Sequence, residues 1–276
     1  MDEDAGRKLK LSPWKKPTFV VLALAALTLL VLPVLSGCGS PARQARVSAP
    51  SPTPIPRPRV VEPAWRSIDR ETLAARLGWG QVSRGDTTKR RIALTFDAGE
   101  DGGPAPAILD ALKSAGLHCT FFLTGQFADK YPDLVKRIAS DGHELGNHSY
   151  THPKFTTLMP EQVSSEISRT EERVKLLTGL STRPYFRFPY GAGSDALVKQ
   201  INGMGYIGVL WTFDTLDSMG ASSQTIIDRV AKYASPGAIV LMHCGFAEEA
   251  KALPSVIKEL EGAGYQIVTL SEVLSP

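Results

Sequence analysis

The sequence predicts an α/β protein in which parallel strands alternate with helices. From Arg90 onward, short apolar runs typical of buried strands alternate with amphipathic segments typical of helices. Ionisable residues follow directly on five consecutive apolar runs, which is where parallel α/β folds place their sites. A chain of 276 residues is long enough for one large α/β domain. These observations favour parallel strands with helices outside, arranged as a barrel or as a doubly wound sheet.

The individual elements follow from length and periodicity. The run R-I-A-L-T-F-D at 91–97 is typical of a buried strand, and the segment 160–178 is typical of a long helix. We expect strands at 91–97, 118–124, 143–147, 185–188, 206–213, 238–243 and 266–270. We expect helices at 104–115, 131–141, 160–178, 195–204, 223–234 and 248–262.

Residues 1–37 are predicted to be an export signal. A basic stretch from Arg7 to Lys16 precedes an uncharged apolar run at 18–35. The residues L-S-G-C at 35–38 resemble the lipobox of bacterial lipoproteins, which implies cleavage before Cys38 and lipidation of that cysteine. The alternative is an uncleaved transmembrane anchor, because the apolar run is long enough to span a bilayer. Either way, we expect the rest of the chain to be held at the extracytoplasmic face of the cell membrane.

Two segments separate this signal from the α/β region. Residues 38–63 are rich in Pro, Ser, Ala and Arg, and every second residue from Pro50 to Pro58 is proline. Such a stretch cannot bury a core and favours extended polyproline geometry, so it is predicted to be a tether. Residues 64–89 form a lead-in segment with a short helix expected at 69–77 and no evident chemistry. The α/β domain is assigned to residues 90–276.

Charge and cysteine content exclude several classes of protein. The net charge is +3, and lysine and arginine are dispersed along the chain, so no nucleic-acid partner is expected. The three cysteines, Cys38, Cys119 and Cys244, have no paired spacing, which excludes a disulfide scaffold and a thiolate zinc site. Cys119 lies near the start of one expected strand and Cys244 at the end of another. Both are therefore expected to be small buried residues that form no disulfide with each other.

The segment 142–153 (G-H-E-L-G-N-H-S-Y-T-H-P) contains three of the five histidines. His148 and His152 are four residues apart, so a helical turn would place both imidazoles on one face, where they can bind one metal ion. A polar loop that is rich in histidine by accident is the alternative. His143 precedes the expected strand residue Glu144 and is interpreted as structural.

The residues that follow the expected strands share a chemistry. They are Asp97, His148, His152, Arg187, Asp214, Asp217 and His243. A single aspartate in such a place is commonly a helix cap or a turn residue, but five consecutive strands ending this way are hard to explain as caps. Carboxylates, imidazoles and a guanidinium that converge on one rim are typical of a metal-assisted hydrolase.

These positions belong to five ordered motifs, and through them the chain resembles the polysaccharide deacetylase family (carbohydrate esterase family 4). The motifs are T-F-D-A-G at 95–99, H-S-Y-T-H-P at 148–153, R-F-P-Y-G at 187–191, W-T-F-D-T-L-D at 211–217 and V-L-M-H at 240–243. The family includes chitin, chitooligosaccharide, peptidoglycan and some acetylxylan deacetylases. The resemblance covers about 90–275 and implies an irregular (β/α) barrel of about seven strands that forms a single catalytic domain.

The resemblance also implies roles for individual residues. Asp97 matches the general base, and Arg187 matches the arginine that holds this base ionised and oriented. His243 matches the general acid that protonates the leaving amine, and Asp217 matches the carboxylate that favours its imidazolium form. The backbone N–H of Tyr190 is expected to face the developing oxyanion.

Two further residues have two interpretations. Leu241 and Trp211 match the walls of the family's acetyl pocket, and plain core packing explains them equally well.

The family's second motif proline is Phe188 here, and Ser218 stands where the family often has tryptophan. Both changes are expected to alter the sugar or acetate pocket without removing the chemistry.

The metal site departs from the family pattern at one ligand. His148 and His152 match two ligands of a divalent metal, with zinc as the expected ion. The family's third ligand is the second aspartate of T-F-D-D-G, and here it is Ala98. Asp101 or Glu100 is a candidate replacement; two histidines with water, or a chain that has lost activity, are the alternatives.

The function expected from these features is metal-dependent removal of N-acetyl groups from an extracellular glycan, with peptidoglycan or chito-oligosaccharide as substrate. Peptidoglycan is favoured because a membrane tether places the domain beside the cell wall. One alternative is a non-catalytic glycan-binding lipoprotein on a decayed deacetylase scaffold. The other is an O-acetyl esterase that acts on xylan.

Overall fold

The computed structural model describes residues 62–99 and 101–276. The predicted export signal, the lipidation site Cys38, nearly all of the tether and Glu100 therefore lie outside the described residues. In the part of the chain that is described, no helix is both long enough and apolar enough to cross a bilayer.

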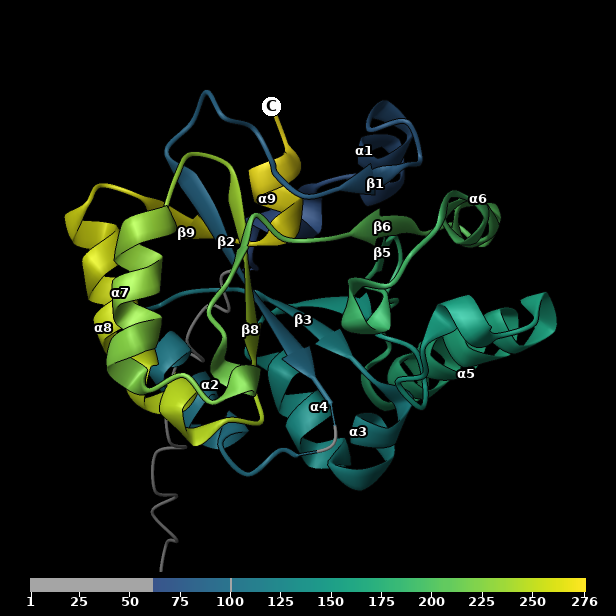
Figure 1. Ribbon diagram of the computed structural model, residues 1–276, viewed down its shortest axis with the longest axis horizontal. Helices are drawn as coiled ribbons and strands as arrows, with labels where there is room; N and C mark the ends of the chain where they lie inside the picture. The colour runs from purple at the N-terminus through teal and green to yellow at the C-terminus, as the bar shows by residue number, and fades with distance from the viewer. Residues whose placement is uncertain (1–61, 100) are drawn as a thin grey trace, which may run out of the picture. The chain divides into compact units, whose positions relative to one another are not determined.

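The strands form one parallel sheet that curls into a half-barrel, as Figure 1 shows. Its order is β1-β6-β5-β4-β3-β2-β8-β7, and β9 also pairs with β2. All named strand pairs are parallel. The strands are β1 (Gln81–Val82), β2 (Arg91–Ala98), β3 (Thr120–Leu123), β4 (Glu144–Asn147), β5 (Tyr185–Phe186), β6 (Ile207–Val209), β7 (Phe213–Asp214), β8 (Ala238–His243) and β9 (Gln266–Val268). The predicted α/β barrel class is confirmed.

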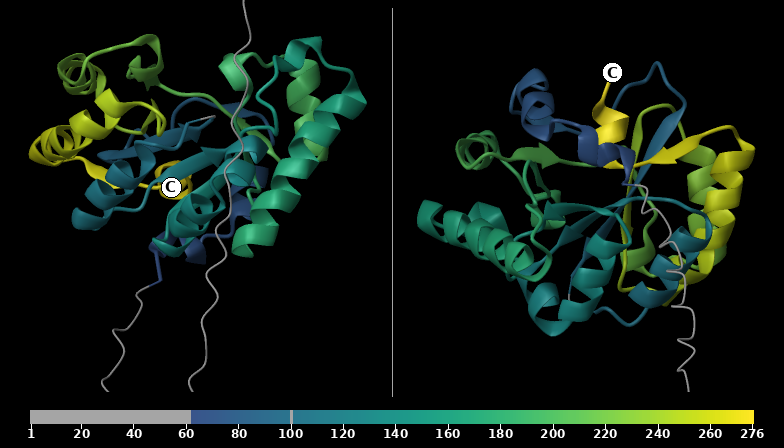
Figure 2. Two further views of the ribbon diagram at one scale, coloured as in Figure 1. Left: turned by 90° about the horizontal axis from the view of Figure 1, so that it is seen from below. Right: turned by 180° about the vertical axis from the view of Figure 1, so that it is seen from behind.

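Helices surround the sheet, as the views in Figure 2 make clear. They are α1 (Arg70–Arg76), α2 (Ala105–Ser114), α3 (Gly125–Lys130), α4 (Pro132–Ser140), α5 (Pro160–Thr178), α6 (Asp195–Gly203), α7 (Ser223–Tyr233), α8 (Ala247–Gly262) and α9 (Leu270–Leu274). Local chemistry sets several boundaries: the side chains of Thr124, Ser194 and Ser222 cap the starts of α3, α6 and α7. Gly179, with φ of 74°, ends α5 in the left-handed conformation.

The nine strands of the described chain exceed the seven expected from the sequence for two reasons. The lead-in segment contributes β1, and the single strand expected at 206–213 is wrong because it divides into β6 and β7. Between them the chain crosses from one edge of the sheet to the other: Leu210 N–H donates to Val82 and Thr212 N–H donates to Ile239. An uninterrupted apolar run cannot reveal this crossing, because buried backbone is apolar whether or not it pairs as a strand.

The lead-in segment, whose role the sequence left open, is part of the folded unit. Trp65 is buried, and its indole N–H donates to the Gly142 carbonyl at 2.8 Å. Leu73 of α1 is buried in one apolar cluster with Leu270 and Val273 of α9. These contacts hold the segment 64–89 against the sheet.

Burial on both faces explains why β2 reads as a continuous apolar run. Phe96 of β2 stacks on Phe121 of β3 with ring centroids 5.0 Å apart, on the face covered by helices. Each such side chain contributes roughly 1.5–3 kcal/mol by leaving water. Thr95 and Asp97 alternate with Phe96 along the strand and are also buried. The register of β2 thus sends its polar side chains to the opposite face, where the site is built.

Candidate active site

A cavity of about 750 Å³ opens at the carboxyl ends of the strands. The sequence-predicted residues that line it are Asp97, Asp101, His148, His152, Tyr190, Trp211, Asp214, Leu241 and His243. Arg187 and Asp217 do not line the cavity; they lie directly behind it, bonded to Asp97 and His243. Strand ends far apart in the sequence therefore meet at one rim, as parallel pairing requires.

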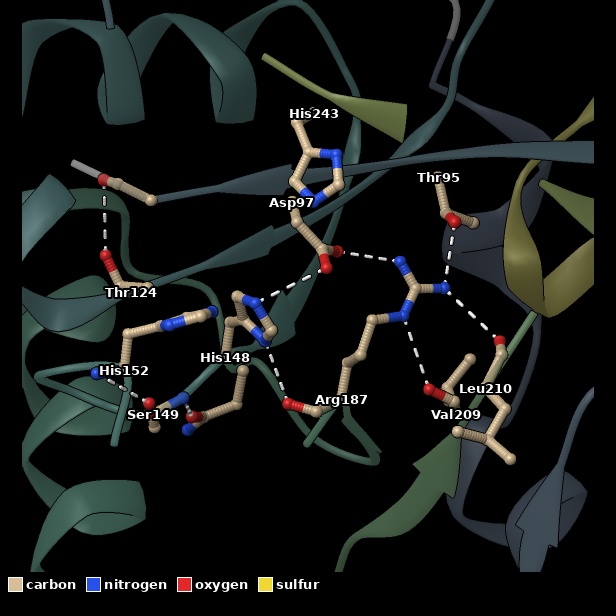
Figure 3. Close-up of polar contacts among 12 residues, drawn as sticks. Thr95, Asp97, Thr124, His148, Ser149, His152, Arg187, Val209, Leu210 and His243 are labelled. Atoms are coloured by element: carbon tan, nitrogen blue, oxygen red, sulfur yellow. Dashed lines mark hydrogen bonds and ion pairs between the residues drawn. The ribbon is translucent and has the colours of Figure 1, made fainter. Parts of the chain in front are cut away.

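Asp97 stands at the centre of this site and is ion-paired with Arg187 (Figure 3). Its Oδ1 accepts a hydrogen bond from Arg187 Nη1 at 2.7 Å, and its Oδ2 lies 3.3 Å from His148 Nε2. Burial alone would raise the pKa of the Asp97 carboxyl. The Arg187 guanidinium, helped by His148 and His243, outweighs burial and holds this pKa below its ordinary value. Asp97 is thus an anion at neutral pH.

Arg187 is fully buried and its donors are used. Besides Asp97, the guanidinium donates to Thr95 Oγ1 at 2.8 Å and to the carbonyl oxygens of Val209 and Leu210 at 3.3 and 3.4 Å. Its carbon lies 4.1 Å from the ring centroid of Phe122. A cation held on all sides in this way cannot turn away from Asp97, so the carboxylate has a fixed orientation.

His148 and His152 meet through a loop and not through a helix, so the helical turn considered from their spacing is wrong. Their ring centroids are 4.8 Å apart, although Ser149 and His152 both have positive φ, 66° and 57°. Side chains satisfy the backbone in place of helical bonds: Glu166 accepts from the N–H groups of Tyr150 and Thr151, and Ser149 Oγ accepts from that of His152. These tertiary contacts stabilise a left-handed backbone that the spacing could not reveal.

The surroundings of His148 fit a bound cation. Burial lowers its pKa to about 4, so the ring is neutral at pH 7 and carries one N–H. Both ring nitrogens face acceptors: Nδ1 lies 2.9 Å from the Arg187 carbonyl, and Nε2 lies 3.3 Å from Asp97 Oδ2. If the single N–H serves the closer carbonyl, Nε2 presents a lone pair to a carboxylate. A cation bound by this nitrogen would resolve the opposition, and the carbonyl contact is the usual outer support of a metal-binding histidine.

The third ligand stays open in the structure as it did in the sequence. Ala98 is fully buried and offers no donor atom. Asp101 lines the cavity, but its Oδ1 accepts a hydrogen bond from Gly103 N–H at 3.0 Å. Across 62–99 and 101–276, no group of three or more His, Cys, Asp or Glu side chains has a metal-binding arrangement. The donors that fit a metal here are the imidazoles of His148 and His152.

His243 forms a second charged pair, with Asp217. Its Nδ1 lies 2.8 Å from Asp217 Oδ1, and Asp217 Oδ2 accepts from the His243 backbone N–H at 2.7 Å. Burial by itself would lower the pKa of His243, but the hydrogen bond to Asp217 and the charges of Asp97, Asp217 and Asp214 raise it above its ordinary value. The shift favours the imidazolium form of this ring, which lies beside Asp97, its register partner on the neighbouring strand β2.

The remaining predicted residues form the walls. Tyr190 adopts φ of 59°, leaves 70% of its side chain exposed and places its ring 4.8 Å from that of His152. Leu241 is buried and Trp211 half-buried, and both line the cavity. Gly191 has φ of 63°, and a Cβ there would approach the Trp211 ring to 2.9 Å, so glycine is required at this position.

Sequence reasoning missed Phe246, which lines the cavity beside His243. It is 39% exposed, and its ring contacts that of His243 edge to face at 5.8 Å. A lone aromatic residue before a helix carries no signal of its own in the sequence.

The structural interpretations of His143 and the two described cysteines agree with their surroundings. His143 is buried, its Nδ1 accepts from Cys119 N–H, and burial lowers its pKa to about 4. Cys119 and Cys244 are buried free thiols, and burial raises both pKa values, that of Cys244 to about 12. Neither thiol is a nucleophile at neutral pH.

The fold and the site together define an α/β half-barrel with a carboxylate and imidazole centre at the carboxyl ends of its strands. The chain belongs to the polysaccharide deacetylase family, whose family model matches residues 84–209. It is 35% identical over 193 residues to the peptidoglycan-N-acetylmuramic acid deacetylase PdaA of Bacillus subtilis, covering 69% of this chain and 73% of the relative. It is 37% identical over 190 residues to a peptidoglycan-N-acetylglucosamine deacetylase of Bacillus cereus, covering 67% and 69%.

A solved structure with the same fold carries a different description. Wild-type BA3943 of Bacillus anthracis, described as a CE4 family pseudoenzyme, superposes with a TM-score of 0.68. The two chains are 30% identical, and the match covers 71% of this chain and 69% of that one.

Proposed function

We propose that this protein is a metal-dependent hydrolase that removes N-acetyl groups from an extracytoplasmic glycan. The observation that carries the proposal is the presence of two residues with opposite charge preferences, Asp97 and His243, side by side in the lining of one cavity. Arg187 lowers the pKa of Asp97 and favours its anion, and Asp217 raises the pKa of His243 and favours its cation. A base and an acid whose pKa values are moved apart are what hydrolysis of an amide requires.

The chain's own residues supply the proton transfers. The oxygen of the attacking water bonds to the acetyl carbon while Asp97 accepts a proton from that water. Before this step Arg187 keeps the Asp97 carboxylate ionised. His243 donates its proton to the sugar nitrogen as the C–N bond breaks, which releases acetate and a free amine. A divalent metal held by His148 and His152 would supply Lewis-acid polarisation of the acetamide carbonyl. The backbone N–H of Tyr190 is proposed as a donor to the oxyanion.

The charge of the cavity favours a neutral sugar, and we propose N-acetylglucosamine over N-acetylmuramic acid. Among the described residues, the lining contains Asp97, Asp101 and Asp214 and no lysine or arginine. The nearby cation Arg187 is buried and committed to Asp97. His243 also lines the cavity, but its imidazole is already paired with Asp217, so a free lactyl carboxylate of muramic acid would face an excess of carboxylates, and like charges repel. We expect a preference of about tenfold in kcat/KM, or about 1.4 kcal/mol, for a glucosamine oligomer.

The proposed location rests on the sequence and on the relatives. The predicted export signal and the predicted lipidation of Cys38 support a location outside the cytoplasm, and the predicted tether supports a position near the wall. Two relatives are named for peptidoglycan. Peptidoglycan is therefore the proposed polymer, with chito-oligosaccharide as a soluble analogue.

Acetate release tests the proposal directly. Purified protein is incubated with N-acetylglucosamine oligomers, with muramic acid-containing peptidoglycan fragments and with acetylated xylan, before and after chelation and metal restoration. Asp97→Asn should abolish release. Asp133→Asn, which removes a carboxylate whose side chain is 93% exposed, should not. Release that persists after chelation or in Asp97→Asn contradicts the mechanism, and release from xylan alone identifies an O-acetyl esterase.

One observation favours a second candidate, a non-catalytic glycan-binding protein. Ala98 removes the family's carboxylate ligand, and a solved relative with the same fold is described as a pseudoenzyme. This candidate predicts glycan binding by calorimetry without acetate release and without bound metal by elemental analysis.

A further inference from the structure

A buried carboxyl group outside the five motifs lies behind the His243–Asp217 pair. Glu249 of α8 has no exposed surface, and its carboxyl group lies close enough to that of Asp217 for a hydrogen bond when one of the two is protonated. The Asp217 side chain is also fully buried. Nothing in the deacetylase chemistry described above uses Glu249.

The surroundings of Glu249 supply too few donors for a carboxylate. Its Oε2 faces the hydroxyl of Thr215 at 3.3 Å, and its Oε1 has no hydrogen-bond donor within reach in the described structure. The one hydroxyl proton of Thr215 is shared with the Leu241 carbonyl at 3.2 Å. A buried carboxylate anion whose one hydrogen-bond donor is shared with another acceptor is unfavourable. A neutral carboxylic acid brings its own proton to donate and needs fewer donors from its surroundings.

Asp217 has the opposite environment. Its Oδ1 accepts from Ser218 N–H at 2.7 Å and faces His243 Nδ1 at 2.8 Å, and its Oδ2 accepts from His243 N–H at 2.7 Å. Three donors and an adjacent imidazolium favour the anion here. Two carboxyl groups in contact and out of water cannot both be ionised, so the proton belongs on Glu249.

The other charged neighbours agree with this assignment. Asp214 of β7 adds negative charge near Glu249, and His243 of β8 is already paired with Asp217. Burial, together with the charges of Asp217 and Asp214, raises the pKa of Glu249 well above its ordinary value.

We propose that Glu249 is a positioning residue: a neutral carboxylic acid that donates a hydrogen bond to Asp217 and thereby sets the orientation of Asp217 and the strength of its hold on His243. The bond draws electron density away from Asp217 and limits how strongly the carboxylate attracts a proton on His243. Glu249 of α8 thus adjusts the proposed general acid His243 through one intervening residue, Asp217. This role rests on the proposed function of His243, but the charge state of Glu249 does not.

The test is the titration of the His243 imidazole by NMR in the purified protein, assigned by comparison with His243→Asn. Glu249→Gln keeps the size of the side chain and a donor, so the His243 titration should move by less than about half a unit. Glu249→Leu removes the donor, so Asp217 becomes more basic and the His243 titration should rise by on the order of half a unit to one unit. Glu248→Gln is the matched control, because it changes a partly exposed glutamate next in the chain that pairs with Lys251. It should leave the His243 titration unchanged.

The outcomes separate the proposal from its rivals. If Glu249 were ionised, Glu249→Gln would remove a negative charge and lower the His243 titration by roughly one to three units, which would overturn the proposal. An unchanged His243 titration in a folded Glu249→Leu would also overturn it. If Glu249→Leu does not fold, the Glu249→Gln titration decides by itself. The pH dependence of activity adds a second readout. In Glu249→Leu its basic limb should shift to higher pH by the same amount as the His243 titration. A protein that releases no acetate still yields the NMR result, so failure of the proposed function is distinguishable.

Discussion

Replacement of Arg187 by methionine tests whether the buried ion pair controls both stability and the charge of Asp97. The guanidinium donates to Asp97 at 2.7 Å and to Thr95 at 2.8 Å, and neither Arg187 nor Asp97 has more than 6% of its side chain exposed. Arg187→Met therefore leaves an anion out of water with its main partner removed. Breaking a buried pair from one side costs about 3–5 kcal/mol in the free energy of unfolding.

A double-mutant cycle separates the pair from the packing. Asp97→Asn removes the stranded charge, so the double variant should be more stable than the sum of the single changes predicts, by about 2–3 kcal/mol. Urea unfolding followed by circular dichroism at pH 7 measures all four proteins. Lys136→Met, which breaks an exposed pair with Asp133, is the control and should change stability little.

The pH dependence of the same variants has a defined sign. In the wild type, the pKa of Asp97 is lowered, so its contribution to stability is present above the unfolded pKa of about 4 and is lost as the pH falls through the folded pKa. In Arg187→Met, burial dominates and raises this pKa. The deficit of the variant relative to wild type should then be larger at pH 7 than at pH 5. Additive single changes, or a deficit that grows as the pH falls, would refute the reasoning.

Three further predictions concern the metal and the acid. Ala98→Asp restores the carboxylate that the family motif has at this position and should raise zinc affinity by at least about tenfold by calorimetry. Ala98→Asn should raise the affinity less, and an equal effect would argue against a charged ligand. His148→Ala should lower the zinc content of purified protein in elemental analysis, and full retention would exclude it as a ligand. Asp217→Asn removes the negative charge and weakens the hydrogen bond that raise the pKa of His243, so the basic limb of the activity profile should shift to lower pH by about one unit or more. An unmoved limb would mean that another group is the acid.

Some elements could be predicted from the sequence because the secondary structure that their local pattern favours is the one that they adopt in the fold. The strand expected at 238–243 and the helix expected at 160–178 have those boundaries in the structure, since long runs with one periodicity are little affected by context. The run 206–213 had the same apolar character, yet it divides into two strands at opposite ends of the sheet. Which strand a buried segment pairs with depends on partners far along the chain.

The candidate site likewise has features that the sequence predicted and features that it could not predict. The order of ionisable strand ends was enough to predict that Asp97, Arg187 and His243 lie together, because parallel strands share one carboxyl edge. The conformation that joins His148 to His152 could not be predicted, since it depends on Glu166 of α5 and on two left-handed residues. Nothing in the sequence singled out a glutamate of an outer helix as a partner of the site.

The amino-acid sequence by itself determined which chemical groups this protein carries and at which strand ends, and it determined that Ala98 cannot bind a metal. Only the tertiary structure decided how these groups are charged. A buried arginine lowers the pKa of Asp97 and favours its anion, and Asp217 raises the pKa of His243 and favours its cation. Protonation follows from burial and from the nearest charge, and both are properties of the folded chain.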